Sequence, residues 1–510
     1  MTTIPVSIDC SASRLEPLVP YWRVCVGGGR VGEALRADFQ KHLEMVQRDF
    51  PFSYIRMHGL FHEDMMVYRE ERGQPIYNWQ YVDLVYDHWL SVGIKPFVEF
   101  GFMPYDLASS DQTIFWWKGN VTPPKDWARW EELIERFLLH VMERYGADEV
   151  RSWYFEVWNE PTLKDFWKDA DFDAYMELYE RTVRVVKAVD PRLRVGGPAS
   201  AGFGDKVGVP PWGKEFLDEC ARRKLPVDFF SAHPYPTLYP VDTEGRGYMV
   251  WDGPDRLELD CRGCDRLLRD SAYPRAERHY TEWSSSPSPR DPVHDTAFMT
   301  AFLVENNLKV RGLMDSLSFW VVSDIFEECR QGDLPFHGGF GLVNVQGLKK
   351  ASYHGYWFLS RLGEEVLSRG DSHIVTRRAD GTVAVLAWNY CHYRDDANDS
   401  RLLASAKGAE IYGLFRDKEA ILFELGASVA GRVARAQITR FDRDHGSAYD
   451  AWAEMGSPAH ILPTDLAVLR RRMELDVRAE RIPAPDGTAR VSVTVEPFGV
   501  SLIEITAEKE

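Results

Sequence analysis

The stretch YFEVWNEPTL, residues 154–163, begins as a β-strand and then ends abruptly. Its first residues are the aromatic and β-branched types that strands favour. Pro161 prevents further pairing because it has no backbone N–H for a ladder hydrogen bond. An amide, Asn159, and a carboxylate, Glu160, stand just before the proline. The stretch therefore predicts a strand that delivers two polar side chains at its end.

The segment before this strand has the pattern of an amphipathic helix. Its apolar residues between 126 and 145 recur at spacings of three and four and form one stripe. Asp126 is a suitable N-cap, and Gly146 follows the last turn. Seven more helices are predicted, at 37–50, 79–92, 172–189, 213–224, 255–271, 296–310 and 352–362.

These helices alternate with short apolar strands over the first two thirds of the chain. Eight strands are predicted, at 22–29, 54–59, 95–102, 153–160, 194–199, 229–235, 278–285 and 315–322. Eight strand–helix units are typical of a (β/α)8 TIM barrel, which we assign to residues 14–360. A doubly wound sheet is the alternative, and VGGGRVGE at 26–33 resembles a phosphate loop. We favour the barrel, because no second strand places the acidic ribose partner of a dinucleotide site.

After about residue 365 the pattern changes to alternating strands. HIVTRRADGTVAVLAWNY, residues 373–390, forms two such runs around an Asp-Gly turn. We predict an accessory all-β sandwich made of residues 1–13 and 361–510, with TIPVSI near the N-terminus as an edge strand. Its other strands are expected at 373–391, about 433–440, 464–477 and 489–506. The long connections within 392–432 and 441–463 are left unassigned.

Composition narrows the classes of partner. The chain has 510 residues, 45% of them hydrophobic, and a net charge of −17. This charge repels phosphate backbones and anionic lipid, so we expect neither nucleic acid nor membrane as a partner and favour a neutral substrate. The N-terminus lacks a signal-peptide pattern, and no uncharged run reaches the ~18 residues of a membrane span. A soluble, cytoplasmic protein is expected, of unknown oligomeric state.

The seven cysteines are scattered along the chain and do not suggest a disulfide framework. Two of them form the motif CRGC at 261–264. A zinc site needs about four ligands, and no second such pair lies nearby. We expect free thiols, with Cys261 and Cys264 on a helix surface.

The predicted strand ends carry polar and aromatic side chains, and the active site of such a barrel lies at these ends. Glu160 on the fourth strand and Glu282 on the seventh form a carboxylate pair in an aromatic mouth, which is the apparatus of glycosidic bond cleavage. A single strand-end glutamate is commonly a solvated loop residue, but the pair favours chemistry. Glu156 lies deeper and is expected to be buried and hydrogen-bonded. The polar and aromatic strand-end residues are His58, Glu99, Phe102, Asn159, Glu160, His233, Tyr235, Glu282, Trp283 and Trp320.

Several longer motifs resemble those of glycoside hydrolase family 39, and in particular its bacterial β-xylosidases. The least specific is FEVWNEP, and the most specific is SDIFEE followed by FHGGFGL. The resemblance extends over most of the chain. The motifs are VGGGRVGEAL (26–35), YIRMHGLFHEDM (54–65), FEVWNEP (155–161), SAHPYP (231–236), TEWSSSPSP (281–289), SDIFEE (323–328), FHGGFGL (336–342) and RDHGSAYDAW (443–452).

The resemblance implies an exo-acting glycosidase, a xylan 1,4-β-xylosidase, that removes terminal β-D-xylose from xylo-oligosaccharides and aryl xylosides. It implies Glu160 as acid/base and Glu282 as nucleophile. Carboxyl groups ~5–5.5 Å apart leave no room for a water, so the configuration is retained by double displacement. We expect no metal or organic cofactor. The resemblance also implies substrate contacts from His58, Asn159, His233, Tyr235, Trp320 and Glu328.

Two alternatives stay open. The same family contains α-L-iduronidases, whose uronic acid substrate would require Arg or Lys at the barrel mouth. Few basic residues lie at the predicted strand ends, and Arg30 and Arg56 are the only near candidates. A neutral pentose is therefore favoured over iduronic acid and over other neutral glycosides. The second alternative is an inactive carbohydrate-binding barrel, against which the presence of both glutamates argues.

Overall fold

The fold was analysed in a computed structural model, which divides into two compact units. Unit 2 comprises residues 21–289 and 310–331, and unit 1 comprises 1–20, 290–309 and 332–510. The expected division at 14–360 stays a prediction. The structure describes residues 1–9, 16–202, 212–240, 242–244, 246–326, 328–403, 406, 408–429 and 431–507.

Unit 2 is built on a closed barrel of eight parallel strands, as predicted. Each strand is a short buried run, as expected where both faces of a parallel sheet are covered. The strands, in order round the barrel, are β3 (Cys25–Arg30), β4 (Tyr54–His58), β7 (Lys95–Phe100), β10 (Tyr154–Val157), β11 (Arg194–Ser200), β12 (Phe229–Ala232), β15 (Glu277–Trp283) and β16 (Ser316–Phe319).

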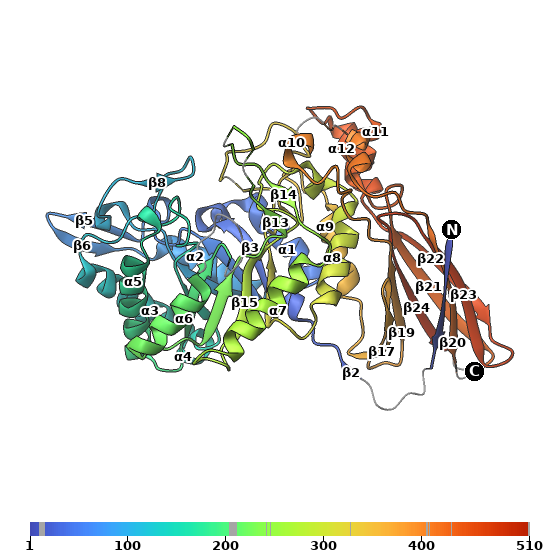
Figure 1. Ribbon diagram of the computed structural model, residues 1–510, viewed down its shortest axis with the longest axis horizontal. Coiled ribbons are helices and arrows are strands. Elements are labelled where there is room, and N and C mark those ends of the chain that lie inside the picture. Colours follow the sequence, from blue (N-terminus) through green and yellow to red (C-terminus); the bar gives the residue numbers. More distant parts are fainter. Residues whose placement is uncertain are drawn as a thin grey trace. The chain divides into compact units, whose positions relative to one another are not determined.

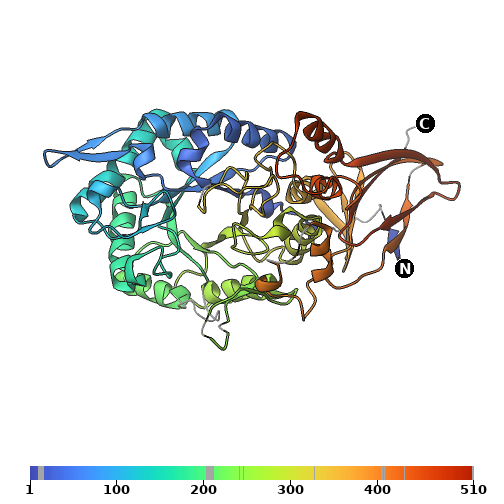
Figure 2. The ribbon, with the colours of Figure 1, turned by 90° about the horizontal axis from the view of Figure 1, so that it is seen from above.

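Helices of unit 2 follow one another round the outside of these strands (Figures 1 and 2). The longest, α3, forms where its apolar stripe predicts it. Its N-cap Asp126 accepts a hydrogen bond from the Ala128 N–H at 2.9 Å, and Gly146 ends the helix with a φ of 87°. The helices of this unit are α1 (Ala37–Asp49), α2 (Gln80–Ser91), α3 (Trp127–Tyr145), α4 (Ala147–Val150), α5 (Phe172–Val189), α6 (Trp212–Arg223) and α7 (Arg256–Arg269).

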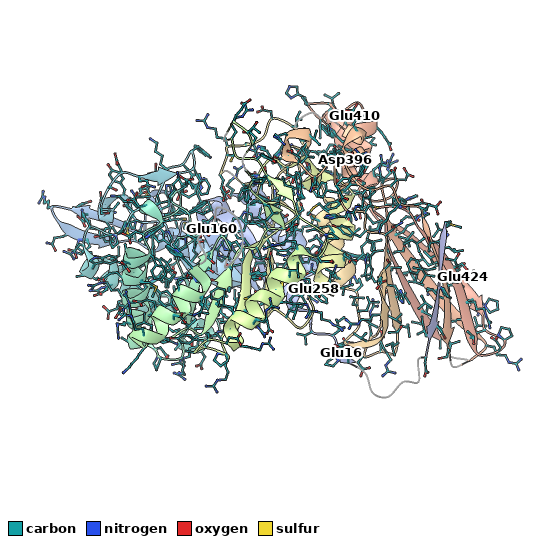
Figure 3. All side chains as sticks on the ribbon, in the orientation of Figure 1. Glu16, Glu160, Glu258, Asp396, Glu410 and Glu424 are labelled. Atoms are coloured by element: carbon teal, nitrogen blue, oxygen red, sulfur yellow. The ribbon has the colours of Figure 1, made fainter. Side chains whose placement is uncertain are left out.

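Unit 1 contains two β-sheets that share one core. Strands β1 (Thr2–Ile8), β20 (Ile421–Ser428) and β23 (Thr488–Val495) form the first sheet, with β1 at its edge as predicted. Buried residues of both sheets, such as Phe423 and Val385, belong to the same hydrophobic cluster, and Glu424 points outward (Figure 3). The second sheet has the order β2 (Glu16–Pro17), β17 (Glu365–Gly370), β18 (His373–Arg377), β19 (Val383–Trp388), β24 (Val500–Ala507), β21 (Val433–Phe441) and β22 (Asp476–Pro483).

The helices of unit 1 include the one element that the sequence reading assigned wrongly. The strand predicted at 464–477 is instead α12 (Pro463–Arg472), because Pro463 opens the helix and Asp465 accepts from the Leu462 N–H at 3.0 Å. The unassigned connections also hold short helices. The other helices are α8 (Phe298–Lys309), α9 (Ala351–Leu359), α10 (Ser400–Leu403) and α11 (Ala448–Glu454).

The cysteines of the described residues are free thiols, as expected. Cys261 and Cys264 are buried in α7, so their predicted surface position is wrong. Their three-residue spacing places both on the inward face of the helix, where Cys261 meets Tyr280 of β15. Cys10 lies outside the described residues. In the part of the chain that is described, no helix is long and apolar enough to cross a membrane.

One glycine of β11 is required by close strand packing. A Cβ added to Gly196 would lie 2.1 Å from the backbone oxygen of Phe229 on β12. A backbone atom cannot move away as a flexible side chain can, so the two strands would have to separate. Gly253 has no heavy atom within 4 Å of its added Cβ and serves as a control in the same unit.

We therefore expect Gly196→Ala to destabilise unit 2 by about 1–3 kcal/mol, the usual cost of overpacking a core. Thermal unfolding followed by circular dichroism should show a Tm several degrees lower than that of the unchanged protein. Gly253→Ala should leave the Tm unchanged. Equal Tm values for the two variants would contradict the close approach of β11 and β12.

Candidate active site

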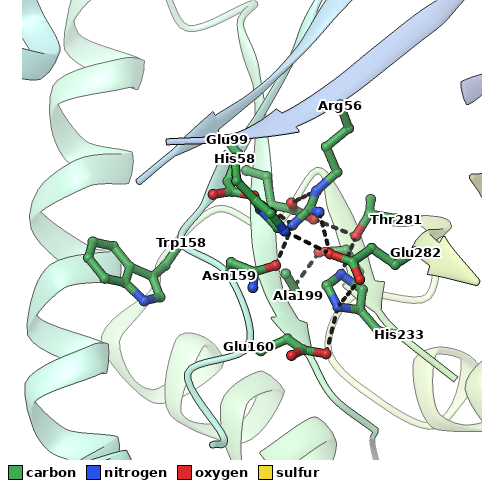
Figure 4. A network of polar contacts seen from close by, with 12 residues as sticks. Arg56, His58, Glu99, Trp158, Asn159, Glu160, Ala199, His233, Thr281 and Glu282 are labelled. Atoms are coloured by element: carbon green, nitrogen blue, oxygen red, sulfur yellow. Dashed lines mark hydrogen bonds and ion pairs between the residues drawn. The ribbon is translucent and has the colours of Figure 1, made fainter. Parts of the chain in front are cut away.

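Polar side chains from several barrel strands converge at the C-terminal ends of the strands (Figure 4). Arg56 and His58 come from β4, Glu99 from β7 and Glu282 from β15. His233 follows directly after β12. All five are buried, so each requires a partner of opposite charge or a hydrogen bond.

The turn after β10 sets the position of Glu160. The strand ends at Val157, and Trp158 and Glu160 take left-handed φ values of 74° and 44°. Trp158 points away from the cluster (Figure 4), and its indole N–H donates to the Phe166 carbonyl at 2.8 Å. The Glu160 N–H donates to the Ala199 carbonyl at 2.9 Å. The strand alternation expected through residue 160 is thus replaced by a strained turn, and such strain collects at functional sites.

Arg56 is the centre of the charge network. Its Nε donates to Glu156 at 2.5 Å, its Nη1 to Glu282 at 2.9 Å and its Nη2 to the Asn159 side-chain oxygen at 2.8 Å. Glu99 lies 3.0 Å from Nη2. Burial lowers the pKa of Arg56, but these carboxylates outweigh burial and hold the pKa above its ordinary value. One guanidinium therefore compensates three buried carboxylates.

Glu282 is held as an anion by several donors. Its Oε1 accepts from Arg56 and lies 3.3 Å from His58 Nε2, and its Oε2 accepts from the Tyr235 hydroxyl at 3.0 Å. Burial raises the pKa of Glu282, but His58 and Arg56 together hold it far below its ordinary value. A carboxylate that stays ionised and oriented in this way is suited to nucleophilic attack.

His58 lies beside three carboxyl groups of the site, and Glu282 is one of them. Its Nδ1 lies 2.6 Å from Glu99, and its Nε2 lies 3.7 Å from Glu328. Burial lowers the pKa of His58, but Glu99 and Glu282 raise it to about 10. Burial also raises the pKa of Glu328 well above its ordinary value, and nearby carboxylates add to this effect. The neighbouring carboxylates thus favour the cationic form of His58, and burial favours the neutral form of Glu328.

Glu160 faces Glu282 across His233. His233 Nδ1 lies 2.9 Å from Glu160 Oε1 and 3.7 Å from Glu282 Oε2. One carboxylate oxygen of Glu160 lies within 4.8 Å of one of Glu282, with the His233 nitrogen inside the same limit. Three such donors could hold a metal ion, so the expectation of no metal stays a prediction. The nearest oxygens of the two carboxyl groups thus lie close enough to approach one carbon from its two sides.

Trp320 forms an aromatic surface beside these groups. Its ring centroid lies 4.8 Å from that of His58, and the Arg56 guanidinium lies 5.9 Å from the Trp320 ring centroid. A Cβ on Gly27 of β3 would lie 2.2 Å from this ring. The glycine therefore provides the room that the indole occupies.

The structure brings the sequence-predicted residues into one cluster, while their catalytic and binding roles stay predictions. Glu156 is buried and hydrogen-bonded, as expected. Sequence reasoning missed Thr281 and considered Arg56 only as a partner for a uronic acid. A charged residue inside a buried strand demands counter-charges, so Arg56, Glu99 and Glu156 together carried the signal. The predicted residues in the cluster are His58, Asn159, Glu160, His233, Tyr235, Glu282, Trp320 and Glu328.

Comparison with known proteins is consistent with this geometry. A family model described as "Glycosyl hydrolases family 39" matches residues 5–488. A protein named beta-xylosidase from Geobacillus stearothermophilus is 40% identical over 98% of this chain and 95% of its own length.

Two solved structures are similar along the whole chain. The GH39 enzyme from Xanthomonas axonopodis pv. citri has a TM-score of 0.89 and 31% identity, and covers 100% of this chain and 98% of its own. A monomeric beta-xylosidase from Caulobacter crescentus CB15 has a TM-score of 0.87 and 34% identity, with 100% of both chains covered. On the family match and these full-length likenesses, the chain belongs to glycosyl hydrolase family 39.

Proposed function

We propose that this chain is a retaining exo-β-xylosidase that removes terminal β-D-xylosyl residues from xylo-oligosaccharides and aryl xylosides. The observation that carries the mechanism is the distance of at most 4.8 Å between a Glu160 oxygen and a Glu282 oxygen. Inverting enzymes separate their carboxyl groups by ~6.5–9.5 Å, whereas retaining enzymes keep them ~5–5.5 Å apart. The relatives named beta-xylosidase, at 40% and 34% identity, support the choice of sugar.

In the first step, a Glu282 oxygen attacks the anomeric carbon while the bond to the leaving oxygen breaks. Glu160 transfers its proton to that oxygen, and the sugar is left as an ester on Glu282. Arg56 engages the Asn159 side-chain oxygen, which leaves the amide N–H groups to bind a sugar hydroxyl. These contacts orient the sugar without taking part in bond breaking.

In the second step, the Glu160 carboxylate removes a proton from water as the water oxygen attacks the anomeric carbon. The ester bond breaks, Glu282 leaves as a carboxylate and Glu160 is again protonated. Two inversions at the same carbon give net retention. Charge is conserved, because the negative charge passes from Glu282 to Glu160 in the first step and returns to Glu282 in the second.

The charges of the site favour a neutral sugar. Arg56 is engaged by Glu99, Glu156 and Glu282, so its guanidinium already has its counter-charges. A uronic acid would bring another carboxylate close to the Glu282 anion, where like charges repel strongly in a buried setting. We therefore favour xylose over iduronic acid.

A panel of nitrophenyl glycosides tests the sugar. We expect the highest kcat/KM for β-D-xyloside, compared with α-L-arabinofuranoside, β-D-glucoside, β-D-galactoside and α-L-iduronide. A preference for the iduronide would show that the charge argument is wrong. Absence of any hydrolysis would instead indicate a carbohydrate-binding barrel.

Azide rescue separates the roles of the two glutamates. In Glu160→Ala, dinitrophenyl β-xyloside needs no proton donor, so the glycosyl-enzyme should accumulate, and azide should restore turnover and give β-xylosyl azide. In Glu282→Ala, the rate of cleavage should fall by several orders of magnitude for all substrates, and any azide product should be the α-anomer. NMR of the products identifies the anomer. The β-azide from the Glu282 variant would reverse the assignment of roles.

The pH profile tests how Glu282 is kept ionised. His58→Gln removes an imidazolium beside Glu282, so the depressed pKa of that carboxyl should rise and the acid limb of kcat/KM should move to higher pH, by about 1 unit. His42→Gln is the matched control, since His42 is also buried and bonded to a side chain, Ser323 Oγ at 2.8 Å. If both variants keep the acid limb of the unchanged enzyme, His58 does not set the ionisation of Glu282.

A further inference from the structure

A chain of hydrogen bonds leads from the central guanidinium to the Glu160 carboxyl group. Arg56 Nε donates to Glu156 Oε2 at 2.5 Å, and the Thr281 hydroxyl donates to Glu156 Oε1 at 2.9 Å. Thr281 Oγ1 lies 3.0 Å from His233 Nε2, and His233 Nδ1 lies 2.9 Å from Glu160 Oε1. The three members between Arg56 and Glu160 are fully buried at 0% exposure, and they are Glu156, Thr281 and His233.

The direction of each bond in this chain follows from the first one. Glu156 forms a buried ion pair with Arg56, so its oxygens accept. Thr281 has a single hydroxyl proton and gives it to Glu156, so toward His233 it can only accept. His233 must therefore carry a proton on Nε2, since its ring is the remaining donor for that bond.

The same logic determines what His233 presents to Glu160. Where Glu160 holds the acid proton of the proposed mechanism, His233 with its proton on Nε2 is neutral and has a bare lone pair on Nδ1. The bond from Nδ1 to Glu160 Oε1 then contains one proton, and that proton comes from the Glu160 carboxyl group. Glu282 Oε2, 3.7 Å from Nδ1, accepts from Tyr235 and supplies no proton.

We propose that Thr281 is a positioning residue that fixes the tautomer of His233 and so keeps the acid proton on the bond between His233 and Glu160. This inference deepens the proposed function and rests on it. In the first step that proton passes to the leaving oxygen. The Glu160 carboxylate then faces the Nδ1 lone pair, which favours taking a proton from the attacking water and closes the cycle.

Two substitutions of Thr281 separate this role from simple packing. Thr281→Ser keeps the hydroxyl and should keep the rate. Thr281→Val removes the acceptor at Nε2, so a neutral His233 can place its proton on Nδ1 and donate to an ionised Glu160. With phenyl β-xyloside, which needs a proton donor, kcat/KM should fall by about 10- to 100-fold, which is part of the roughly 10²–10⁴-fold that general acid catalysis contributes. With dinitrophenyl β-xyloside it should change little, and the alkaline limb of the pH profile should move to lower pH.

Thr182 offers a matched control in the same unit. It too is buried, accepts from a ring nitrogen, Trp130 Nε1 at 2.9 Å, and donates to an oxygen, the Leu178 carbonyl at 2.7 Å. Thr182→Val should lower the Tm and leave unchanged the ratio of the kcat/KM values for the two substrates. The positioning role would be overturned if Thr281→Val lowered kcat/KM equally for both substrates. It would also be overturned if Thr182→Val changed the ratio of the two kcat/KM values in the same way.

A spectroscopic measurement tests the tautomer without any turnover. In protein labelled with ¹⁵N-histidine, the His233 signals can be assigned by their loss in His233→Gln. Their chemical shifts should report a proton on Nε2 in the unchanged protein and on Nδ1 in Thr281→Val. A neutral His233 protonated on Nδ1 in the unchanged protein would overturn the inference. Failure to cleave any xyloside, with Nε2 protonated, would contradict the proposed function alone.

Discussion

A single buried cation, Arg56, is the constraint on which the site depends. A guanidinium in a barrel interior is stable only if its desolvation is offset by counter-charges in good geometry. Glu99, Glu156 and Glu282 provide them from three other strands. The converse also holds, since these carboxylates could not share so small a volume without the guanidinium. Removal of one partner of a buried ion pair typically costs about 3–5 kcal/mol, so the network couples the position of Glu282 to the stability of the barrel.

The two glutamates are placed by different means, and the difference suits their chemistry. Glu282 is part of a regular strand and is surrounded by donors, which fix it as an anion. Glu160 lies beyond the end of its strand, in a left-handed turn whose N–H bonds to Ala199. Its side chain is bonded to His233 and is 12% exposed. In the proposed mechanism Glu160 first loses and then regains a proton, and this access to water favours that role.

The sequence predicts the barrel well because each strand is marked by a run of apolar residues and a polar end. The apolar runs predict the position of every barrel strand. The polar residues at the strand ends single out the pair Glu160 and Glu282. The helix at 463–472 could not be distinguished from a strand by its apolar alternation alone, and its proline start was the better signal. Thr281 could not be found, because a threonine in a strand is ordinary, and only the distances to His233 and Glu156 give it a role.

The packing of Trp320 against Gly27 determines at which stage of synthesis and folding this part of the site can form. Gly27 lies on the first barrel strand and Trp320 directly after the last, and the Val322 N–H bonds to the Gly27 carbonyl at 2.8 Å. These residues are far apart along the chain, so ribosomal synthesis delivers them at widely separated times. The indole takes its place only when the last strand closes on the first. A nascent or partly folded chain therefore lacks this aromatic wall, and the cluster at the strand ends is complete only after closure of the barrel.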